Sequence, residues 1–170
     1  MATPCIVSSY SHLFGEEIIR FRYPDIAQDI DAISKLHVAP PTPSKEKTKM
    51  GRLVYRGENF NPIFEHHFRQ RGWEPRKLPY GGEVDFVKGR VAMEVQFGKY
   101  SFVAYDLTKL QDLFTLNEID VGVEMIPAAA LTAKMYTGVA NFNSEVARLQ
   151  ARGRNQPPMP LWLIGIDAVE

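Results

Sequence analysis

The sequence predicts an α/β fold, in which a mixed β-sheet is flanked by helices on both faces. Residues 83–97 alternate apolar and polar side chains around a glycine, which is typical of a β-hairpin with one buried face. Two apolar segments, 120–127 and 159–167, have the length of strands. Helical patterns precede each of them, and strands joined through helices usually lie parallel. We therefore expect an antiparallel hairpin that continues into parallel strands.

The N-terminal part is expected to contain one helix followed by a loop. Residues 25–36 place four aliphatic side chains at helical spacing, with Asp25 as a candidate cap. Residues 39–52 are first rich in proline and then basic. This composition favours a solvated surface loop over a segment that contacts phosphates.

Three further helices follow from the hydrophobic spacing. Residues 60–73 bring aromatic side chains to one face, with Asn61 as a candidate cap before a proline. Residues 101–114 place leucines at inward positions. Residues 143–152 begin with an asparagine and a serine that are both candidate caps, and a glycine closes the segment.

Length and composition are those of an ordinary globular chain. The 170 residues favour one domain, and 45% of them are hydrophobic while 24% are charged. Cys5 is the only cysteine, so an intramolecular disulfide is excluded and a reducing, cytoplasmic setting is expected. Neither a signal peptide nor a membrane span is expected. The net charge of zero excludes a surface that is basic throughout, but acidic catalytic residues and basic DNA-facing residues can cancel in a nuclease.

The hairpin places two carboxylates close together. With a two-residue loop at Lys88 and Gly89, Asp85 lies diagonally across from Glu94, and with a four-residue loop the two are directly opposite. Both registers put the carboxylates on one face, with Cβ atoms about 5–8 Å apart. A three-residue loop would put Met93 opposite Asp85 and break this arrangement, unless a β-bulge restores it. Gln96 shares the face of Glu94 in every register, because side chains two apart in a strand point the same way.

Two carboxylates at this separation repel each other unless a cation lies between them. Mg²⁺ suits such a site, since it prefers oxygen ligands and takes one or two carboxylates together with water and phosphate oxygens. The alternative is that Asp85 and Glu94 are solvent-facing strand residues without an ion.

The segment EVDFVKGRVAMEVQFGKYSF, residues 83–102, resembles the active-site region of the BglII and BstYI type restriction endonucleases, which belong to the PD-(D/E)XK nuclease superfamily. Their variant motif is an Asp, a Glu nine residues later, and a Gln two residues after the Glu. Asp85, Glu94 and Gln96 match it, and the likeness extends more weakly over most of the chain. The resemblance implies a restriction-endonuclease-like core in a single domain, 1–170, with an N-terminal helical part and basic loop (1–58) before the catalytic core (59–170).

The resemblance also implies an activity and roles for the site residues. It implies a homodimeric type II restriction endonuclease that uses Mg²⁺, which Mn²⁺ can replace, to cut short palindromic double-stranded DNA, leaving 5′-phosphates. No organic cofactor and no membrane partner are expected. Asp85, Glu94 and the carbonyl of Val95 would bind the metal, and Gln96 would orient the attacking water. Relatives have a further polar active-site residue upstream, for which Glu65 and Arg76 are the candidates here.

Several residues are expected to contact DNA. Those that follow the motif in this family lie near the major groove, and the loop before the 143–152 helix is its other recognition segment. Lys88 and Arg90, beside the active site, are expected at phosphates. The expected DNA contacts are Lys88, Arg90, Gly98, Lys99, Tyr100, Lys134, Tyr136 and Thr137.

Two other functions remain open at this point. One is a repair or structure-specific nuclease of the same superfamily, which would not give discrete fragments from a plasmid. The other is a non-catalytic DNA-binding protein, which would need no divalent ion.

Overall fold

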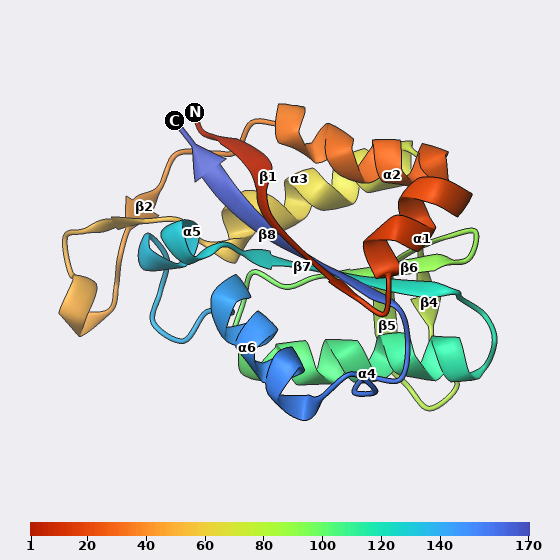
Figure 1. Ribbon diagram of the computed structural model, residues 1–170. Helices are drawn as coiled ribbons and strands as arrows, with labels where there is room; N and C mark the ends of the chain where they lie inside the picture. The colour runs from red at the N-terminus through yellow and green to blue at the C-terminus, as the bar shows by residue number, and fades with distance from the viewer.

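A computed structural model describes residues 1–170, and its centre is one six-stranded sheet (Figure 1). The strand order is β1-β8-β7-β6-β5-β4. Strands β6, β7 and β8 run parallel, while β1, β5 and β4 pair antiparallel to their neighbours. The fold class expected from the sequence is therefore confirmed. The strands of this sheet are β1 (Thr3–His12), β4 (Glu74–Lys77), β5 (Glu83–Lys88), β6 (Val91–Val95), β7 (Val121–Pro127) and β8 (Leu161–Val169).

Helices cover both faces of the sheet. Helices α1, α2 and α3 lie on one face, and α4 and α6 lie on the other (Figure 1). Helix α4 connects β6 to β7, and α5 and α6 lie between β7 and β8. The helices are α1 (Gly15–Arg22), α2 (Pro24–Asp31), α3 (Gly57–Gln70), α4 (Ser101–Thr115), α5 (Ala129–Ala133) and α6 (Phe142–Arg152), with 3₁₀ turns η1 (Ala32–Lys35) and η2 (Lys47–Lys49).

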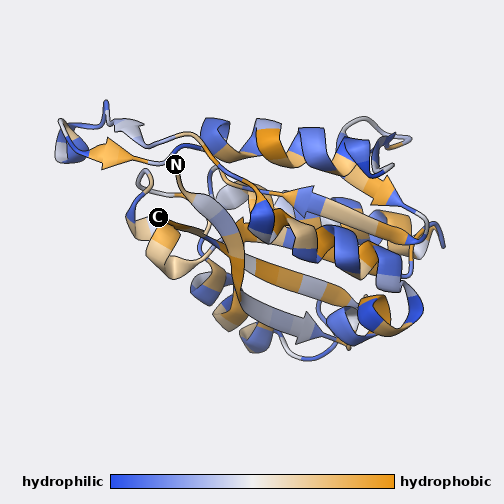
Figure 2. Cartoon of the chain, turned by 90° about the horizontal axis from the view of Figure 1, so that it is seen from above, coloured by the Kyte–Doolittle hydropathy of each residue, from blue (hydrophilic) through white to orange (hydrophobic).

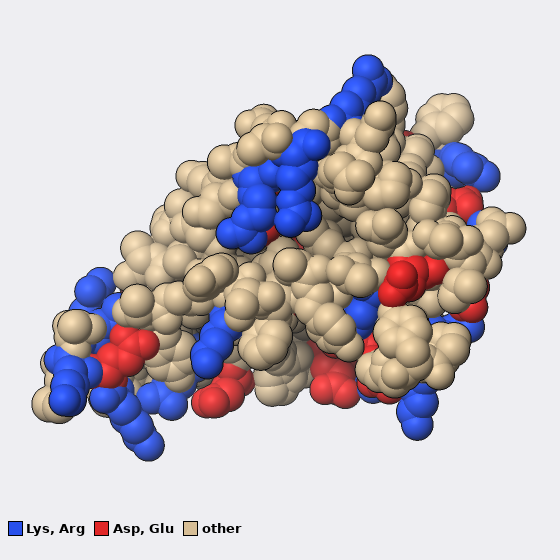
Figure 3. Space-filling model, turned by 90° about the horizontal axis from the view of Figure 1, so that it is seen from below, with Lys and Arg blue, Asp and Glu red and all other residues tan.

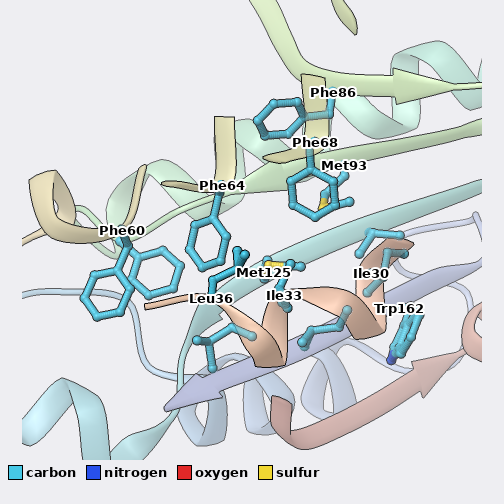
Figure 4. Close-up of a cluster of buried hydrophobic side chains, with 14 of the residues drawn as sticks. Ile30, Ile33, Leu36, Phe60, Phe64, Phe68, Phe86, Met93, Met125 and Trp162 are labelled. Atoms are coloured by element: carbon cyan, nitrogen blue, oxygen red, sulfur yellow. The ribbon is translucent and has the colours of Figure 1, made fainter. Parts of the chain in front are cut away.

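Two apolar cores fill the space between the sheet and its helices. In the larger core, Phe60, Phe64 and Phe68 of α3 lie above the sheet with Met93 and Met125 (Figure 4). The smaller core joins the leucines of α4 to the opposite face of β7 and β8. In Figure 2, orange runs along part of the sheet, while the helices alternate orange and blue. Parallel strands covered on both faces are apolar throughout, as β8 is.

Strand β6 differs from the half-solvated strand that its alternating pattern predicts. Val91, Ala92, Met93 and Glu94 are all buried, because α3 covers one face of the strand and α4 the other. Glu94 is only 1% exposed, so it lies inside the protein and not on a solvent-facing strand. A buried carboxylate requires a local reason, which the site supplies.

The N-terminal part is richer in structure than the sequence predicts. The predicted helix 25–36 is α2 followed by η1, and the edge strand β1 and helix α1 before it were missed. Residues 39–52 do not form a simple loop: strands β2 (Thr42–Pro43) and β3 (Leu53–Val54) pair antiparallel. We call residues 42–54 the arm, because they extend from one end of the molecule (Figure 1).

The boundaries of two predicted helices shift. Helix α3 begins at Gly57, so Asn61 lies inside it and does not cap it. Helix α6 is capped by Asn141, whose Oδ1 accepts a hydrogen bond from the backbone N–H of Ser144 at 3.3 Å. None of the helices has the length and apolar character needed to cross a membrane.

Candidate active site

The turn of the β5–β6 hairpin fixes how Asp85 and Glu94 face each other. Phe86 pairs with Met93, and the ladder continues to Lys88 and Val91, which leaves a two-residue turn. Extended in the other direction, this register sets Asp85 opposite Glu94. This is the register predicted for a four-residue loop at 88–91. The turn is shorter than that loop because Lys88 and Val91 also pair with each other. Gly89 adopts φ 57°, as the tight turn requires.

Hydrogen bonds and an ion pair hold both carboxylates. The backbone N–H of Val95 donates to Asp85 Oδ2 at 2.9 Å. The ammonium of Lys109 lies 2.6 Å from Glu94 Oε1, in an ion pair without hydrogen-bond geometry, so this oxygen has no hydrogen-bond donor. Each acid thus keeps acceptor capacity on an oxygen inside the protein.

Helix α4 supplies two residues that the sequence analysis missed. Lys109 Nζ lies 3.0 Å from Asp106 Oδ1 and also donates to the backbone carbonyl of Glu83 at 3.0 Å. Both side chains are nearly buried. They stand three positions apart, each directly before an inward leucine, and charged residues beside the buried stripe of a helix could have indicated their position.

Two hydrogen bonds orient the side-chain amide of Gln96. Its Nε2 donates to Asp106 Oδ2 at 2.8 Å, and its Oε1 accepts from the backbone N–H of Gly98 at 2.9 Å. An amide has two N–H donors and two acceptor lone pairs, so one of each remains available. A Cβ atom on Gly98 would lie 2.8 Å from Gln96 Oε1, which explains glycine at this position.

Glu124 is the fourth acid of the site, after Asp85, Glu94 and Asp106, and it was also missed. In the parallel ladder it is the partner of Glu94, and its side chain is fully buried. Neither of its carboxylate oxygens has a hydrogen-bond partner. Burial, together with the charges of Asp106 and Glu94, raises the pKa of Glu124 well above its usual value.

The site contains more acidic than basic side chains, and the pKa values of Asp85, Glu94 and Glu124 are raised. Burial and the nearby charges of Asp85 and Asp106 raise the pKa of Glu94 to about 9. Burial also raises the pKa of Asp85, although the hydrogen bond from Val95 opposes the shift. Burial lowers the pKa of Lys109, but its contacts with Glu94 and Asp106 outweigh that effect and raise it.

This arrangement fits a divalent metal ion. Lys109 supplies one positive charge against Asp85, Glu94, Asp106 and Glu124, so a cation would favour the ionised carboxylates. No three acidic, histidine or cysteine side chains form a complete cage. A divalent ion that prefers oxygen ligands needs only one or two carboxylates from the protein, because water and phosphate oxygens complete its shell.

Asp85, Glu94 and Asp106 line a pocket of about 470 Å³. Glu65, one of the two predicted upstream residues, lines it and forms an ion pair with Arg69 at 3.1 Å. Arg76, the other, does not line it and instead pairs with Glu118 at 2.8 Å. The pocket also contains Asn61, which the sequence analysis took for a helix cap. The pocket is lined by Asn61, Phe64, Glu65, Arg69, Glu83, Asp85, Phe86, Glu94, Val95, Gln96, Phe102, Tyr105, Asp106 and Lys109.

The two segments expected to read DNA lie side by side. Lys99 forms an isolated β-bridge with Val139, and the backbone N–H of Tyr100 donates to the carbonyl of Gly138 at 2.9 Å. A groove of about 600 Å³ runs next to these segments and shares Asn61 and Gln96 with the pocket. Of the predicted DNA contacts, the groove is lined by Gly98, Lys99, Tyr136 and Thr137, while Tyr100 and Lys134 are exposed outside it.

Lys88 and Arg90 do not reach the pocket, contrary to the expectation that they lie beside the active site. Lys88 Nζ lies 2.7 Å from Asp29 of α2, because Lys88 shares the sheet face of its partner Val91. Arg90 pairs with Asp120 at 2.8 Å at the far end of the hairpin. Their contact with DNA stays an untested prediction.

Comparison with known proteins identifies the family. The family model described as restriction endonuclease BglII/BglIII matches residues 7–166. The chain belongs to this restriction endonuclease family. Its fold resembles a crystal structure of restriction endonuclease BglII complexed with a DNA 16-mer, with a TM-score of 0.81 and 17% identity over 93% of this chain and 74% of that chain. A search of curated proteins gave no match.

Family membership sets the class of reaction. The protein is a type II restriction endonuclease, that is, a site-specific deoxyribonuclease, and the family depends on a divalent metal. The acid pair at the open end of the hairpin offers oxygen ligands of the kind that a divalent metal takes.

Proposed function

We propose that this restriction endonuclease hydrolyses phosphodiester bonds in a short palindromic site of double-stranded DNA, with Mg²⁺ as the metal, and leaves 5′-phosphates. Mn²⁺ would substitute, since it also accepts oxygen ligands. The observation that carries the proposal is the meeting of Asp85, Glu94 and Gln96 in one pocket, beside the further buried acids Asp106 and Glu124. The DNA-bound structure that the chain resembles supports a duplex substrate.

Asp85 and Glu94, with the carbonyl of Val95, would hold the metal. When bound, the metal would lower the pKa of a water molecule and offset the charge of the scissile phosphate. The hydrogen bond from the Val95 N–H keeps the Asp85 carboxylate at the end of β6, close to that carbonyl. This bond places ligands from two strands together before any substrate arrives.

Gln96 would position the attacking water by hydrogen bonds. Asp106 and Gly98 fix its amide, so its remaining N–H and lone pair point in a defined way. An amide adds no charge, and Lys109 is the cation that stabilises the neighbouring carboxylates. Glu65 lines the pocket from α3 and would serve as the upstream polar residue.

The DNA would lie across the pocket and the adjoining groove. Gly98, Lys99, Tyr136 and Thr137 would contact it there, with Tyr100 and Lys134 at the edge. Lys88 and Arg90 would contact phosphates only after leaving their present acidic partners.

We also propose that the enzyme is a homodimer, since a two-fold protein matches a palindromic site. Tyr100, which directly precedes α4, and Phe102 and Tyr105 of α4 are each about half exposed, and exposed aromatic groups favour a macromolecular contact on this face. One sheet that uses both the first and the last strand supports a single domain over 1–170. The lone Cys5 supports a reducing, cytoplasmic setting.

The decisive experiment replaces the acids without changing their shape. We expect Asp85→Asn and Glu94→Gln each to lower the single-turnover cleavage rate at least about a thousandfold, because metal-derived stabilisation of several kcal/mol is lost. DNA affinity should stay within about tenfold, since phosphate contacts elsewhere dominate it. The rate is measured on a mixed-sequence plasmid with Mg²⁺, where the unaltered protein should give discrete fragments.

Asp25→Asn serves as the control, because Asp25 is exposed and lines neither the catalytic pocket nor the groove. Normal cleavage by both acid variants would show that the reaction occurs elsewhere. A smear of fragments from the unaltered protein would exclude a defined recognition site.

A further inference from the structure

The arm concentrates positive charge in a chain whose net charge is zero. Residues 42–54 contain four basic side chains and one acidic side chain. Figure 3 shows Lys and Arg side chains gathered at the end of the molecule where the arm lies. None of the expected DNA contacts falls within this segment.

Part of this charge fastens the arm to the loop that follows α5. Lys49 donates to the carbonyl of Met135, and Arg52 Nη2 donates to that of Ala133 at 3.2 Å. The only acid of the arm, Glu46, accepts hydrogen bonds from the backbone N–H and Oγ1 of Thr137, at 3.2 and 3.1 Å. The arm is therefore held in place, and its one negative charge is already engaged.

Lys45 and Lys47 are the basic residues of the arm left without a partner. Both are exposed, and neither has a carboxylate within 4.0 Å. Lys45 lines the groove of about 600 Å³ that continues into the catalytic pocket. An unpaired lysine on the groove and a second one two residues further along the arm are suited to the phosphates of a nucleic-acid strand.

Arg56 lines the same groove, and part of its guanidinium has no hydrogen-bond acceptor. Its guanidinium lies over the ring of Tyr136, 5.4 Å from the centroid, and Nη2 donates to the carbonyl of Pro43 at 3.2 Å. The buried Nε has no acceptor, and the only carboxylate nearby belongs to exposed Glu58, at 4.0 Å from Nη1. A buried N–H without an acceptor is costly, and a planar guanidinium fork matches two phosphate oxygens.

We propose that the arm and the groove bind the DNA backbone next to the scissile phosphate, with Lys45, Lys47 and Arg56 as the phosphate contacts. This inference rests on the proposed function, because the groove is placed by its junction with the catalytic pocket at Asn61 and Gln96. The stacking on Tyr136 and the bond to Pro43 orient Arg56 in advance, so little side-chain freedom is lost on binding.

Salt dependence of DNA binding tests the proposal directly. Affinity for a long mixed-sequence duplex is measured at increasing salt, with Ca²⁺ in place of Mg²⁺ to hold hydrolysis back. Each phosphate contact contributes about 0.9 to the slope of log affinity against log salt. We expect Lys45→Ala/Lys47→Ala to reduce the slope by about two, and Arg56→Lys to keep the slope while weakening binding about tenfold.

The matched control is Lys35→Ala/Arg154→Ala, which removes two exposed basic residues that line neither the pocket nor the groove. Its slope should equal that of the unaltered protein, and thermal unfolding checks that every variant folds. An unchanged slope in the arm variant overturns the arm proposal, while discrete plasmid fragments from the unaltered protein leave the proposed function standing. An unaltered protein that binds no duplex and cuts none overturns both.

Discussion

Glu94 shows how one residue can be both costly to the fold and suited to the reaction. Its side chain is buried and faces Asp85, and only Lys109 balances its charge. Burying this carboxyl group costs stability even beside Lys109, because the group must either be ionised inside the protein or take up a proton. The cost of burying Glu94 is consistent with a site in which a bound metal ion offsets the charge of its carboxylate.

Gly98 lies so close to the amide of Gln96 that a side chain at this position should disturb it. We expect Gly98→Ala to lower cleavage about tenfold to a hundredfold, because the new Cβ would lie 2.8 Å from Gln96 Oε1 and displace the amide. The backbone of Gly98 is not in the left-handed region, so folding should be little affected.

The measurement is single-turnover cleavage beside urea unfolding. A rate equal to that of the unaltered protein would mean that the orientation of Gln96 does not matter. A loss of stability above about 1 kcal/mol would instead place the effect in the fold.

At the scale of elements, the site depends on how α3 packs against the end of β6. The rings of Phe60 and Phe64 lie 4.7 and 5.4 Å from that of Phe97, which directly follows Gln96. This aromatic contact brings α3, with Glu65 and Asn61, to the rim of the pocket. The helix that precedes the hairpin in the sequence therefore forms one wall of the site.

Removing one ring of this contact should destabilise the whole protein. We expect Phe64→Ala to lower the free energy of unfolding by about 3–5 kcal/mol, because Phe64 is fully buried and a cavity remains. Urea denaturation measures the change. Phe21→Ala is the control, since Phe21 is 91% exposed and should change stability by less than about 0.5 kcal/mol. Equal effects of the two substitutions would contradict the packing argument.

The elements that the sequence predicted well are those with strong periodicity. Helix α4 matches its prediction within one residue, because its leucines repeat at helical spacing along one face. Strand β1 was missed because three serines interrupt its apolar residues, and pairing with β8 determines its structure. The short strands of the arm likewise depend on their contacts with residues 133–137 and have little local signal.

At the scale of the whole molecule, the acid cluster predicts how stability changes with pH. The pKa of Glu94 rises from 4.5 to about 9 on folding, so the folded protein holds a proton that the unfolded chain releases. The contribution of this proton to the free energy of unfolding is therefore present at low pH and is lost as the pH rises towards 9. Glu124, whose pKa is also raised, acts in the same direction. Without metal, we expect the free energy of unfolding to fall between pH 6 and 9, by up to about 1 kcal/mol per pH unit.

Urea unfolding in EDTA at several pH values measures this slope. Glu94→Gln should make the slope shallower, and saturating Mg²⁺ should raise stability most at high pH, where Glu94 is ionised and free to bind it. A metal-free protein whose stability rises from pH 6 to 9 would contradict the assigned burial of these acids.

The sequence by itself determined the α/β class, the hairpin and the acid pair with its amide, because these depend on alternation and spacing between residues close in the chain. Only the tertiary structure decided that Lys109, Asp106 and Glu124 belong to the same site, that Lys88 and Arg90 face away from it, and that the arm adjoins it. These facts depend on which elements pack together, and burial and charge at a site arise from all of its neighbours at once.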